Sequence, residues 1–547
     1  MTGWTAALVA AAILLGPPRA LAQRELPDPA LDVLHYDFAL TLPDGGDHVA
    51  ATATITVART HAADTLALDL VGLAVDSVRV NGAPVTPRRT AERLFVPLPP
   101  GARDTLHVSV AYEGEPDDGL IIRQDSAGRW TYFGDNWPNR ARHWLPTVDH
   151  PADKATVTWW VSAPASETVV GNGTQVDQHA VPPLAPGGAA RRLTEWNEIR
   201  PISTYLMVIA AAPLVETPLG ETACGFGSVS RCVPQMVYTA PEQADYMPGP
   251  FAEADSIVTF FSRLIAPYPF EKLAHLQSST RFGGMENASE IFYFDGAFRR
   301  RTMNDGLISH ETAHQWFGDA VTEADWPELW LSEGFATYFS ALFTQHAHGD
   351  SAFRASMRDI RRRVLTDDRV ATLPVIDTVE TNLMSLLDAN SYQKGGFVLH
   401  MLRTQLGDSA FFRGLRIYFH AHEFANATSD DLRVALEQSS GRSLAAFFDQ
   451  WLRRPGYPIL TVHWAYDAAA HTARVTVDQS DRFGFYRAPL TVELRDGAGQ
   501  SQRATIQLDA SARTAVSIPV SLRAAPTALV ADPDVDLLAK ITVVEQH

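Results

Sequence analysis

The segment His310-Glu311-Thr312-Ala313-His314 contains two histidines and a glutamate in a spacing typical of a metal-binding helix. Its two histidines are four residues apart, so on a helix both imidazoles lie on one face and can reach a single ion. Glu311 lies beside the first histidine, where its carboxylate can accept a proton from a water held by that ion. The pattern therefore predicts a helix that carries two metal ligands and a general base.

A third ligand is expected at Glu333, which eighteen residues separate from His314. Between them, Gly318, a polar stretch and Pro327 predict a helix, a loop and a second helix that returns Glu333 to the ion. Catalytic zinc typically takes three protein ligands and keeps one position for water. We therefore expect one Zn²⁺ per chain, held by His310, His314 and Glu333. The second helix has apolar residues at helical spacing, interpreted as core: Leu331, Phe335, Tyr338, Phe339 and Leu342.

Composition bounds what else the chain can be. Its 547 residues are too many for one hydrophobic core, so about two to four domains are expected. The formal net charge is -18 and no long basic tract occurs, so nucleic acid is not an expected partner. The short clusters Arg299-Arg300-Arg301 and Arg361-Arg362-Arg363 are interpreted as solvated helix or loop surface.

The N-terminus has the pattern of a signal peptide over residues 1–22. Residues 5–15 are small and apolar, Gly16-Pro17-Pro18 breaks a helix, and Ala20-Leu21-Ala22 places small residues where a signal peptidase reads. Cleavage before Gln23 and export to the periplasm or the extracellular space are expected. A short membrane anchor is the alternative, but the apolar run is well below the ~20 residues that span a bilayer, so no stable membrane insertion of the mature chain is expected.

The only two cysteines, Cys224 and Cys232, are close together in sequence. In an exported chain such a pair is typical of a local disulfide across a tight loop. A reduced pair is the alternative. Two thiols alone do not make a closed zinc site, so no metal is assigned to them.

The pattern of apolar residues changes twice along the chain. Residues 23–215 alternate between apolar and polar as antiparallel strands do, for example at 36–42 and 52–57, and 181–188 is an expected hairpin loop. Residues 216–455 contain long apolar-periodic segments, and residues 456–547 alternate again and suffice for a small β-sandwich. The expected helices are Ala252–Leu264, Gly306–Phe317, Pro327–His346, Gln393–Leu406 and Ser429–Gln438. The sequence predicts a multidomain α+β protein with an N-terminal β domain, a helical middle and a C-terminal β-sandwich.

The metal-binding segments resemble a known family. The runs HETAHQWFGD at 310–319 and WLSEGFA at 330–336 resemble the aminopeptidase N type of gluzincin zinc peptidases, a family that also contains leukotriene hydrolases. The resemblance implies a thermolysin-like, mainly helical catalytic domain at 216–455. Family members commonly have Asn where this chain has Asp319 and Ser332. Two roles are open for Asp319: it orients a ligand, or it lies at the surface end of a helix.

A second motif, Gly283-Gly284-Met285-Glu286-Asn287, resembles the exopeptidase strand of the family. In the family this strand lines the substrate backbone and its glutamate binds the free α-amino group, so the resemblance implies that these five residues bind substrate. The residue types agree with that role. Glycines let a backbone approach closely, and a carboxylate pairs with an ammonium.

A third segment, Tyr392-Gln393-Lys394-Gly395, resembles the family segment whose tyrosine stabilises the oxyanion of the tetrahedral intermediate. A phenol donor aimed at developing negative charge is a recognised strategy. Tyr392 therefore joins Glu311 as an expected catalytic residue, and Lys394 is given no catalytic role.

Two features depart from the family pattern. Before Ala141 the family usually carries a further Glu or Gln that helps hold the substrate amine, and here residues 134–139 read GDNWPN. Asp135 or Asn136 could substitute, or the contact is absent; Asp135 is taken as the expected substrate contact. The chain also ends after the second β region, whereas long members carry a further helical domain. The expectation is a more open cleft, or closure by another subunit of a homo-oligomer.

The leading prediction is an aminopeptidase that acts on peptides with a free N-terminus. A thermolysin-like endopeptidase is an alternative, but it needs no amine anchor, and the intact motif around Glu286 argues against it. A zinc-containing binding protein without catalysis is another, although such proteins usually lose the base or a ligand, and both are present here. Nothing in the sequence favours epoxide hydrolysis of the leukotriene type. Met285 and residues 132–137 are candidates for the walls of the side-chain pocket.

Overall fold

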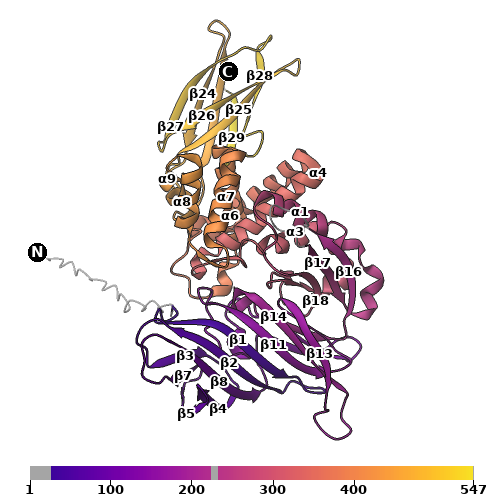
Figure 1. The fold of residues 1–547 in the computed structure, drawn as a ribbon. Helices are drawn as coiled ribbons and strands as arrows, with labels where there is room; N and C mark the ends of the chain where they lie inside the picture. The colour runs from indigo at the N-terminus through magenta and orange to yellow at the C-terminus, as the bar shows by residue number, and fades with distance from the viewer. Residues whose placement is uncertain (1–25, 223–231, 546–547) are drawn as a thin grey trace, which may run out of the picture.

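The computed structural model of the protein describes residues 26–222 and 232–545 (Figure 1). The expected signal peptide at 1–22 and Cys224 lie outside the described residues, and Cys232 is disulfide-bonded. Within the two described ranges, no helix is long and apolar enough to cross a membrane. Figure 1 shows three parts that follow one another along the molecule: a β-rich N-terminal part, a helical middle part and a β-rich C-terminal part. This arrangement confirms the predicted fold class.

The N-terminal part is built on an eight-stranded sheet with the order β13-β14-β11-β1-β2-β8-β4-β5. In β1, Tyr36, Phe38 and Leu40 alternate into the core and are at most 1% exposed, as the apolar alternation predicts. The expected loop at 181–188 joins β13 to β14. The strands are β1 Leu31–Thr41, β2 Val49–Arg59, β3 Thr65–Asp69, β4 Ala74–Val80, β5 Ala83–Val85, β6 Arg88–Arg89, β7 Arg93–Pro97, β8 Asp104–Gly114, β9 Leu120–Gln124, β10 Trp130–Gly134, β11 Lys154–Pro164, β12 Thr168–Gly171, β13 Thr174–Val181, β14 Arg191–Ser203 and β15 Ile209–Ala212.

The middle part combines a five-stranded sheet, in the order β16-β17-β18-β20-β19, with the helices. Its first strand begins at Val215. The strands are β16 Val215–Thr222, β17 Val233–Thr239, β18 Leu273–Ser278, β19 Gly284–Met285, β20 Glu290–Phe294, β21 Val321–Glu323 and β22 Ala425–Ala427. The helices are α1 Ala254–Leu264, α2 Asp295–Arg299, α3 Asp305–His314, α4 Trp330–Thr366, α5 Asp368–Thr372, α6 Gly395–Leu406, α7 Asp408–His422, α8 Ser429–Ser440 and α9 Ala445–Leu452.

All five expected helices are present, with shifted ends. Helix α3 begins at Asp305, one residue before the predicted start, and the Asn304 side chain accepts a hydrogen bond from the Leu307 amide and caps the first turn. Pro327 lies in a short 3₁₀ turn, and α4 begins after it at Trp330. Helix α4 then continues to Thr366 across a kink at Gly349, whose φ is 80°. The prediction ended this helix at His346, twenty residues too early, although the second half carries its own buried stripe of Phe353, Met357, Ile360 and Val364.

Three glycines, Gly334, Gly395 and Gly396, let α4 approach the helical turn η7 (Asn390–Lys394) and α6, and we call this contact the glycine seam. A Cβ on Gly334 would lie 2.9–3.1 Å from the backbone of Gly395 and Gly396, closer than packed atoms tolerate. Gly334 follows Glu333 directly, and Tyr392 lies in η7. The seam therefore brings the predicted third ligand and the predicted oxyanion donor together.

The N-terminal part holds the loop that follows α3. The Lys154 ammonium donates to the carbonyls of Asp319 (2.9 Å) and Ala320 (3.0 Å), and the Tyr205 hydroxyl donates to the Gly318 carbonyl (3.2 Å). Burial lowers the pKa of Lys154 to about 7. The position of the loop after His314, the second expected metal ligand, thus depends on residues far away in the sequence.

The C-terminal part is a two-sheet structure, with the orders β27-β24-β23-β29 and β26-β25-β28. It packs on the end of α4, where Arg361 pairs with Asp532 and the Leu365 carbonyl accepts from the Tyr457 hydroxyl at 3.0 Å. The strands are β23 Ile459–Asp467, β24 Thr472–Gln479, β25 Ala488–Asp496, β26 Ser501–Leu508, β27 Arg513–Pro519, β28 Pro526–Ala531 and β29 Lys540–Glu545.

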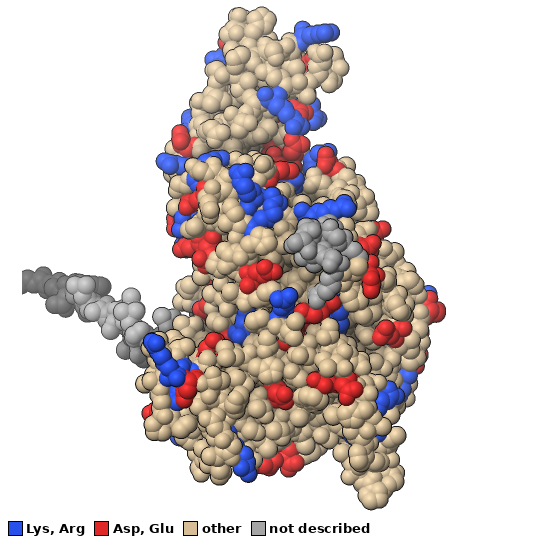
Figure 2. Space-filling view, in the orientation of Figure 1, with Lys and Arg blue, Asp and Glu red and all other residues tan. Residues whose placement is uncertain are grey.

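The basic clusters noted in the sequence are largely paired with acids. Arg299 pairs with Asp295 at 3.0 Å, and Arg362 pairs with Asp359 at 3.1 Å. On the face drawn in Figure 2, Lys and Arg lie in small groups among Asp and Glu. These clusters are therefore part of a mixed, solvated surface.

Candidate metal centre and substrate cavity

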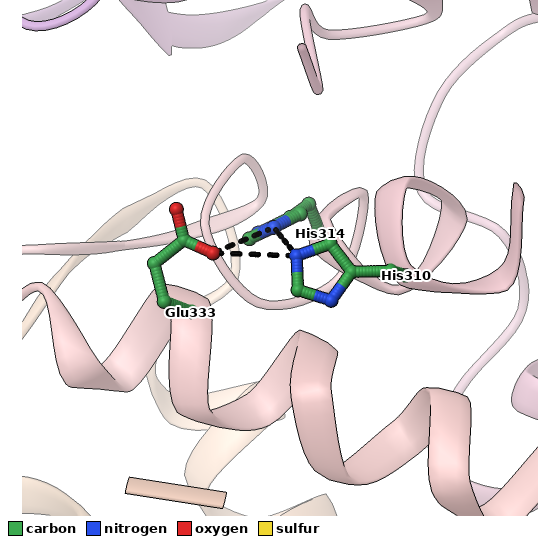
Figure 3. A group of neighbouring side chains, drawn as sticks. All are labelled: His310, His314 and Glu333. Atoms are coloured by element: carbon green, nitrogen blue, oxygen red, sulfur yellow. Dashed lines mark hydrogen bonds and ion pairs between the residues drawn. The ribbon is translucent and has the colours of Figure 1, made fainter. Parts of the chain in front are cut away.

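The three predicted metal ligands converge on one point (Figure 3). His310 and His314 lie one turn apart on α3, and Glu333 lies in the first turn of α4. The two Nε2 atoms are 3.3 Å apart, and Glu333 Oε2 is 3.3 Å from Nε2 of His310 and 3.4 Å from Nε2 of His314. A tetrahedral zinc with bonds of ~2.0–2.1 Å spaces its ligand atoms about 3.3–3.4 Å apart. The residues therefore fit a zinc ion with no rearrangement.

The charges around these ligands favour a cation. Burial alone would raise the pKa of Glu333, but the adjacent imidazoles hold it at about 2, so its carboxylate is ionised. Burial alone would lower the pKa of His314, but Glu286 and Glu333 raise it to about 10. The carboxylates of Glu286 and Glu333 thus surround the two imidazoles with negative charge, which a divalent cation would balance.

Neighbouring polar groups orient the ligands. The Ser332 hydroxyl lies 2.9 Å from Nδ1 of His314, and the Tyr392 hydroxyl donates to Oε1 of Glu333 at 2.6 Å. These contacts leave Nε2 of His314 and Oε2 of Glu333 for the ion. Gly318 makes room for the first contact, since a Cβ there would lie 2.5 Å from the Ser332 oxygen. Ser332 was not among the predicted site residues, although its place directly before Glu333 was a usable signal.

The expected general base lies against the expected substrate strand. Glu311 is 5% exposed, and a Cβ on Gly284 would lie 2.2 Å from its Oε1. Glycine is thus the residue that lets β19 pass over this carboxylate. Burial raises the pKa of Glu311 well above its ordinary value. Side-chain oxygens of Glu311 and Glu286 and a ring nitrogen of His314 all lie within 4.8 Å of one another.

The segment around Glu286 is held by Gln315, which comes directly after α3. The Gln315 amide donates to the Glu286 carbonyl at 2.9 Å and to Oδ2 of Asp319 at 2.7 Å, and its oxygen accepts from the Ser289 amide at 2.9 Å. Asp319 is fully buried, so the surface interpretation of this residue is wrong. Its carboxylate instead fixes the glutamine that positions the strand.

One cavity of about 260 Å³ joins these groups. The residues that line it are Trp137, Phe282, Gly283, Gly284, Met285, Glu286, Leu307, His310, Glu311, His314, Glu333, Leu387 and Tyr392. The structure thus brings together the three expected ligands, both expected catalytic residues and four of the five residues of the expected substrate strand. Asn287, the fifth, is fully buried and is not among the lining residues.

The structure places Asp135 outside this cavity, in contrast to the prediction that it contacts substrate. Asp135 is fully buried, and its carboxylate accepts from the Thr280 hydroxyl at 3.0 Å and pairs with Arg140 and Arg281, each at 3.0 Å. The carboxylate is therefore already neutralised by two cations. Trp137 reaches the cavity instead, and its ring packs edge-to-face on Phe282 with centroids 5.9 Å apart.

Comparison with known proteins places the chain among zinc peptidases. Glutamyl aminopeptidase of Homo sapiens is 29% identical over 348 residues, covering 60% of this chain and 34% of the relative. Aminopeptidase N of Streptomyces lividans is 28% identical over 422 residues, covering 72% of this chain and 46% of the relative. Probable aminopeptidase 2 of Sulfurisphaera tokodaii is 26% identical over 457 residues, covering 78% and 54%. The chain spans between 34% and 54% of the length of these relatives.

Solved structures agree with these relatives. The M1 zinc metallopeptidase of Deinococcus radiodurans is 29% identical with a TM-score of 0.67, covering 78% of this chain and 94% of that one. A mutant of that enzyme bound to a Tyr-Ser-Ala substrate is 28% identical to this chain, with a TM-score of 0.68. The model of the peptidase M1 N-terminal domain matches residues 33–206, and the model of the peptidase family M1 domain matches residues 252–451. Together with the zinc-ligand geometry, these matches show that the chain belongs to peptidase family M1.

Proposed function

We propose that this protein is a zinc-dependent aminopeptidase that hydrolyses the N-terminal peptide bond of peptides with a free N-terminus. The observation that carries the proposal is the single cavity where His310, His314 and Glu333 meet Glu311, Tyr392 and Glu286. A zinc site, a base, an oxyanion donor and an amine anchor are the groups that this reaction needs.

The residues divide the reaction among them. Bound zinc supplies Lewis acidity toward a water and toward the scissile carbonyl. Glu311 takes a proton from the attacking water and passes it to the leaving amine, and its raised pKa suits a carboxyl that must hold this proton between the two steps. The Tyr392 hydroxyl, which donates to Glu333 in this structure, is placed to donate to the oxyanion.

Glu286 favours an exopeptidase over an endopeptidase. Its side chain lines the cavity, is 6% exposed and lies close to Glu311. A substrate with a free ammonium would neutralise this carboxylate, whereas an internal peptide segment would cover it with an uncharged group and leave a buried charge unpaired. The alternative of a zinc-binding protein without catalysis is disfavoured by the intact base and the intact ligand set.

The amine requirement is the direct test of the function. We expect the wild-type protein to hydrolyse a leucyl anilide with kcat/KM about 100-fold or more above its N-acetylated form, because only the free amine pairs with Glu286. The variant Glu286→Gln should lower kcat/KM for the free amine by about 10- to 100-fold, the range of a lost charge-assisted hydrogen bond. Steady-state kinetics on both substrates provides the measurement, and equal rates for the two would overturn the exopeptidase proposal.

The role of Glu311 separates catalysis from metal binding. The variant Glu311→Gln should lose about 10²–10⁴-fold in kcat, because an amide cannot accept the proton of the attacking water. It should retain one zinc per chain, because Glu311 is not one of the three expected zinc ligands. Parallel kinetics and metal analysis of the purified variant check this. A variant that keeps wild-type activity contradicts the assignment of the base.

The walls of the cavity favour large apolar N-terminal residues. Trp137, Phe282, Met285, Leu307 and Leu387 line it, and no Lys or Arg is among the lining residues in the described part of the chain. The Deinococcus radiodurans relative was captured with a substrate that begins with Tyr. An acidic side chain would enter this cavity without a partner for its charge.

We therefore expect phenylalanyl, tyrosyl or leucyl anilides to exceed the glutamyl anilide in kcat/KM by on the order of tenfold or more. The variant Trp137→Ala should reduce this ratio, because the aromatic contact with the substrate side chain is lost. Kinetics over a panel of aminoacyl anilides measures the ratio. A preference for the glutamyl substrate would contradict the assignment of these walls.

We also propose that the protein is exported to the periplasm or the extracellular space. The apolar N-terminal pattern of residues 1–22 supports this, and so does the disulfide-bonded Cys232, since disulfides persist in oxidising compartments. N-terminal sequencing of the mature protein should begin at Gln23. A retained Met1 would contradict cleavage.

A further inference from the structure

A second cavity of about 450 Å³ adjoins the substrate cavity, and the two share Leu387 and Tyr392. We call it the side groove. Its lining residues come from the end of α4 and from the segment that leads into η7: Arg363, Thr366, Asp367, Leu387, Asp388, Ala389, Tyr392 and Gln393. The groove thus starts at the hydroxyl-bearing residue that is assigned to the scissile carbonyl.

The chemistry of an aminopeptidase determines what such a groove can hold. With the ammonium at Glu286, one residue of the substrate lies before the scissile bond and all others lie after it. An extended chain advances ~3.3–3.6 Å per residue, so the C-terminus of a tripeptide lies roughly 7 Å beyond the first residue. A space that continues the cavity past Tyr392 is therefore available to the residues after the scissile bond.

The carboxylates that line the side groove already have partners. Asp388 pairs through Oδ2 with Nε of Arg369 at 2.8 Å, and its Oδ1 accepts from the Asn390 amide at 2.8 Å. Asp367 accepts through Oδ1 from the backbone amides of Arg369 and Val370 at 2.8 and 3.3 Å, as the cap of α5. Their negative charge is thus largely engaged within the fold.

The arginine that lines the side groove differs, since it has no acidic partner in the described part of the chain. The side chain of Arg363 is exposed, and across residues 26–222 and 232–545 its guanidinium makes no ion pair. Its two neighbours on α4 differ from it, since Arg361 pairs with Asp532 and Arg362 pairs with Asp359. Of the three successive arginines, the one that faces the groove is the one available to an anion.

We propose that the side groove receives the part of the peptide that follows the scissile bond, and that Arg363 pairs there with a substrate carboxylate. A carboxylate matches the planar fork of a guanidinium, and short peptides carry one at their C-terminus. The inference rests on the proposed aminopeptidase function. It adds a substrate class: short peptides with a free carboxylate after the scissile bond.

The test compares substrates that differ only in this carboxylate. Wild-type protein is assayed with Leu-Ala-Ala and its C-terminal amide, with Leu-Ala-Glu-amide and Leu-Ala-Gln-amide, and with a leucyl anilide that does not enter the groove. The variant Arg363→Ala should raise KM by about three- to tenfold for the carboxylate member of a pair, the range of an exposed ion pair with charge-assisted hydrogen bonds. It should leave the neutral member and the anilide unchanged, and Arg363→Lys should retain part of the effect.

Arg362→Ala provides the matched control, because this exposed arginine on the same helix does not line the groove. An effect confined to the first peptide pair identifies the C-terminal carboxylate as the bound group, and an effect confined to the second pair identifies an acidic side chain. The proposal is overturned if Arg363→Ala changes both members of each pair equally, or neither. Failure of the wild-type protein to hydrolyse the anilide would instead contradict the aminopeptidase function itself.

Discussion

The contact between α3 and α4 is the constraint on which the rest of the site depends, because it holds three donor atoms 3.3–3.4 Å apart. Two histidines on one helix face supply only two of the three protein ligands that a catalytic zinc typically takes, and here the third comes from the neighbouring helix α4. Glycines make this approach possible, with Gly318 next to the Ser332 hydroxyl and Gly334 against the backbone of Gly395. The ligand geometry is therefore built into the backbone packing.

The same packing positions the groups to which we assign the proposed reaction. Gln315, the residue after α3, donates to the carbonyl of Glu286, so the proposed amine anchor is tied to the helix that carries two of the expected zinc ligands. Tyr392 reaches Glu333 because η7 lies along the glycine seam. The N-terminal part contributes as well, since Lys154 holds the loop after α3 and Trp137 lines the cavity. The N-terminal β domain, which lies far from the expected metal ligands in sequence, thus helps to form the proposed substrate cavity.

Short-range sequence patterns predicted the candidate metal centre, whereas the ion-pair partners of individual side chains depend on long-range contacts that these patterns do not contain. The i, i+4 spacing and the helix-loop-helix to Glu333 are local, so the fold class and the convergence of the expected ligands with Glu311 could be predicted from the sequence. The contacts of Asp135 could not be predicted in this way, because its partner Arg281 is 146 positions away in the sequence. Only the fold shows that the Asp135 carboxylate is already ion-paired. The sequence could not show either that Arg363, unlike Arg361 and Arg362, has no ion pair within residues 26–222 and 232–545, because three successive arginines look alike until their partners are known.

X-ray absorption at the zinc edge of the purified protein tests whether His310, His314 and Glu333 hold the metal, since it reports the identity, number and distance of the donor atoms. We expect one zinc per chain, with nitrogen and oxygen donors at about 2.0–2.2 Å, two imidazole rings and no sulfur. A sulfur donor near ~2.3 Å, or zinc that stays bound at full occupancy after Glu333→Ala and His314→Ala together, would contradict this ligand set.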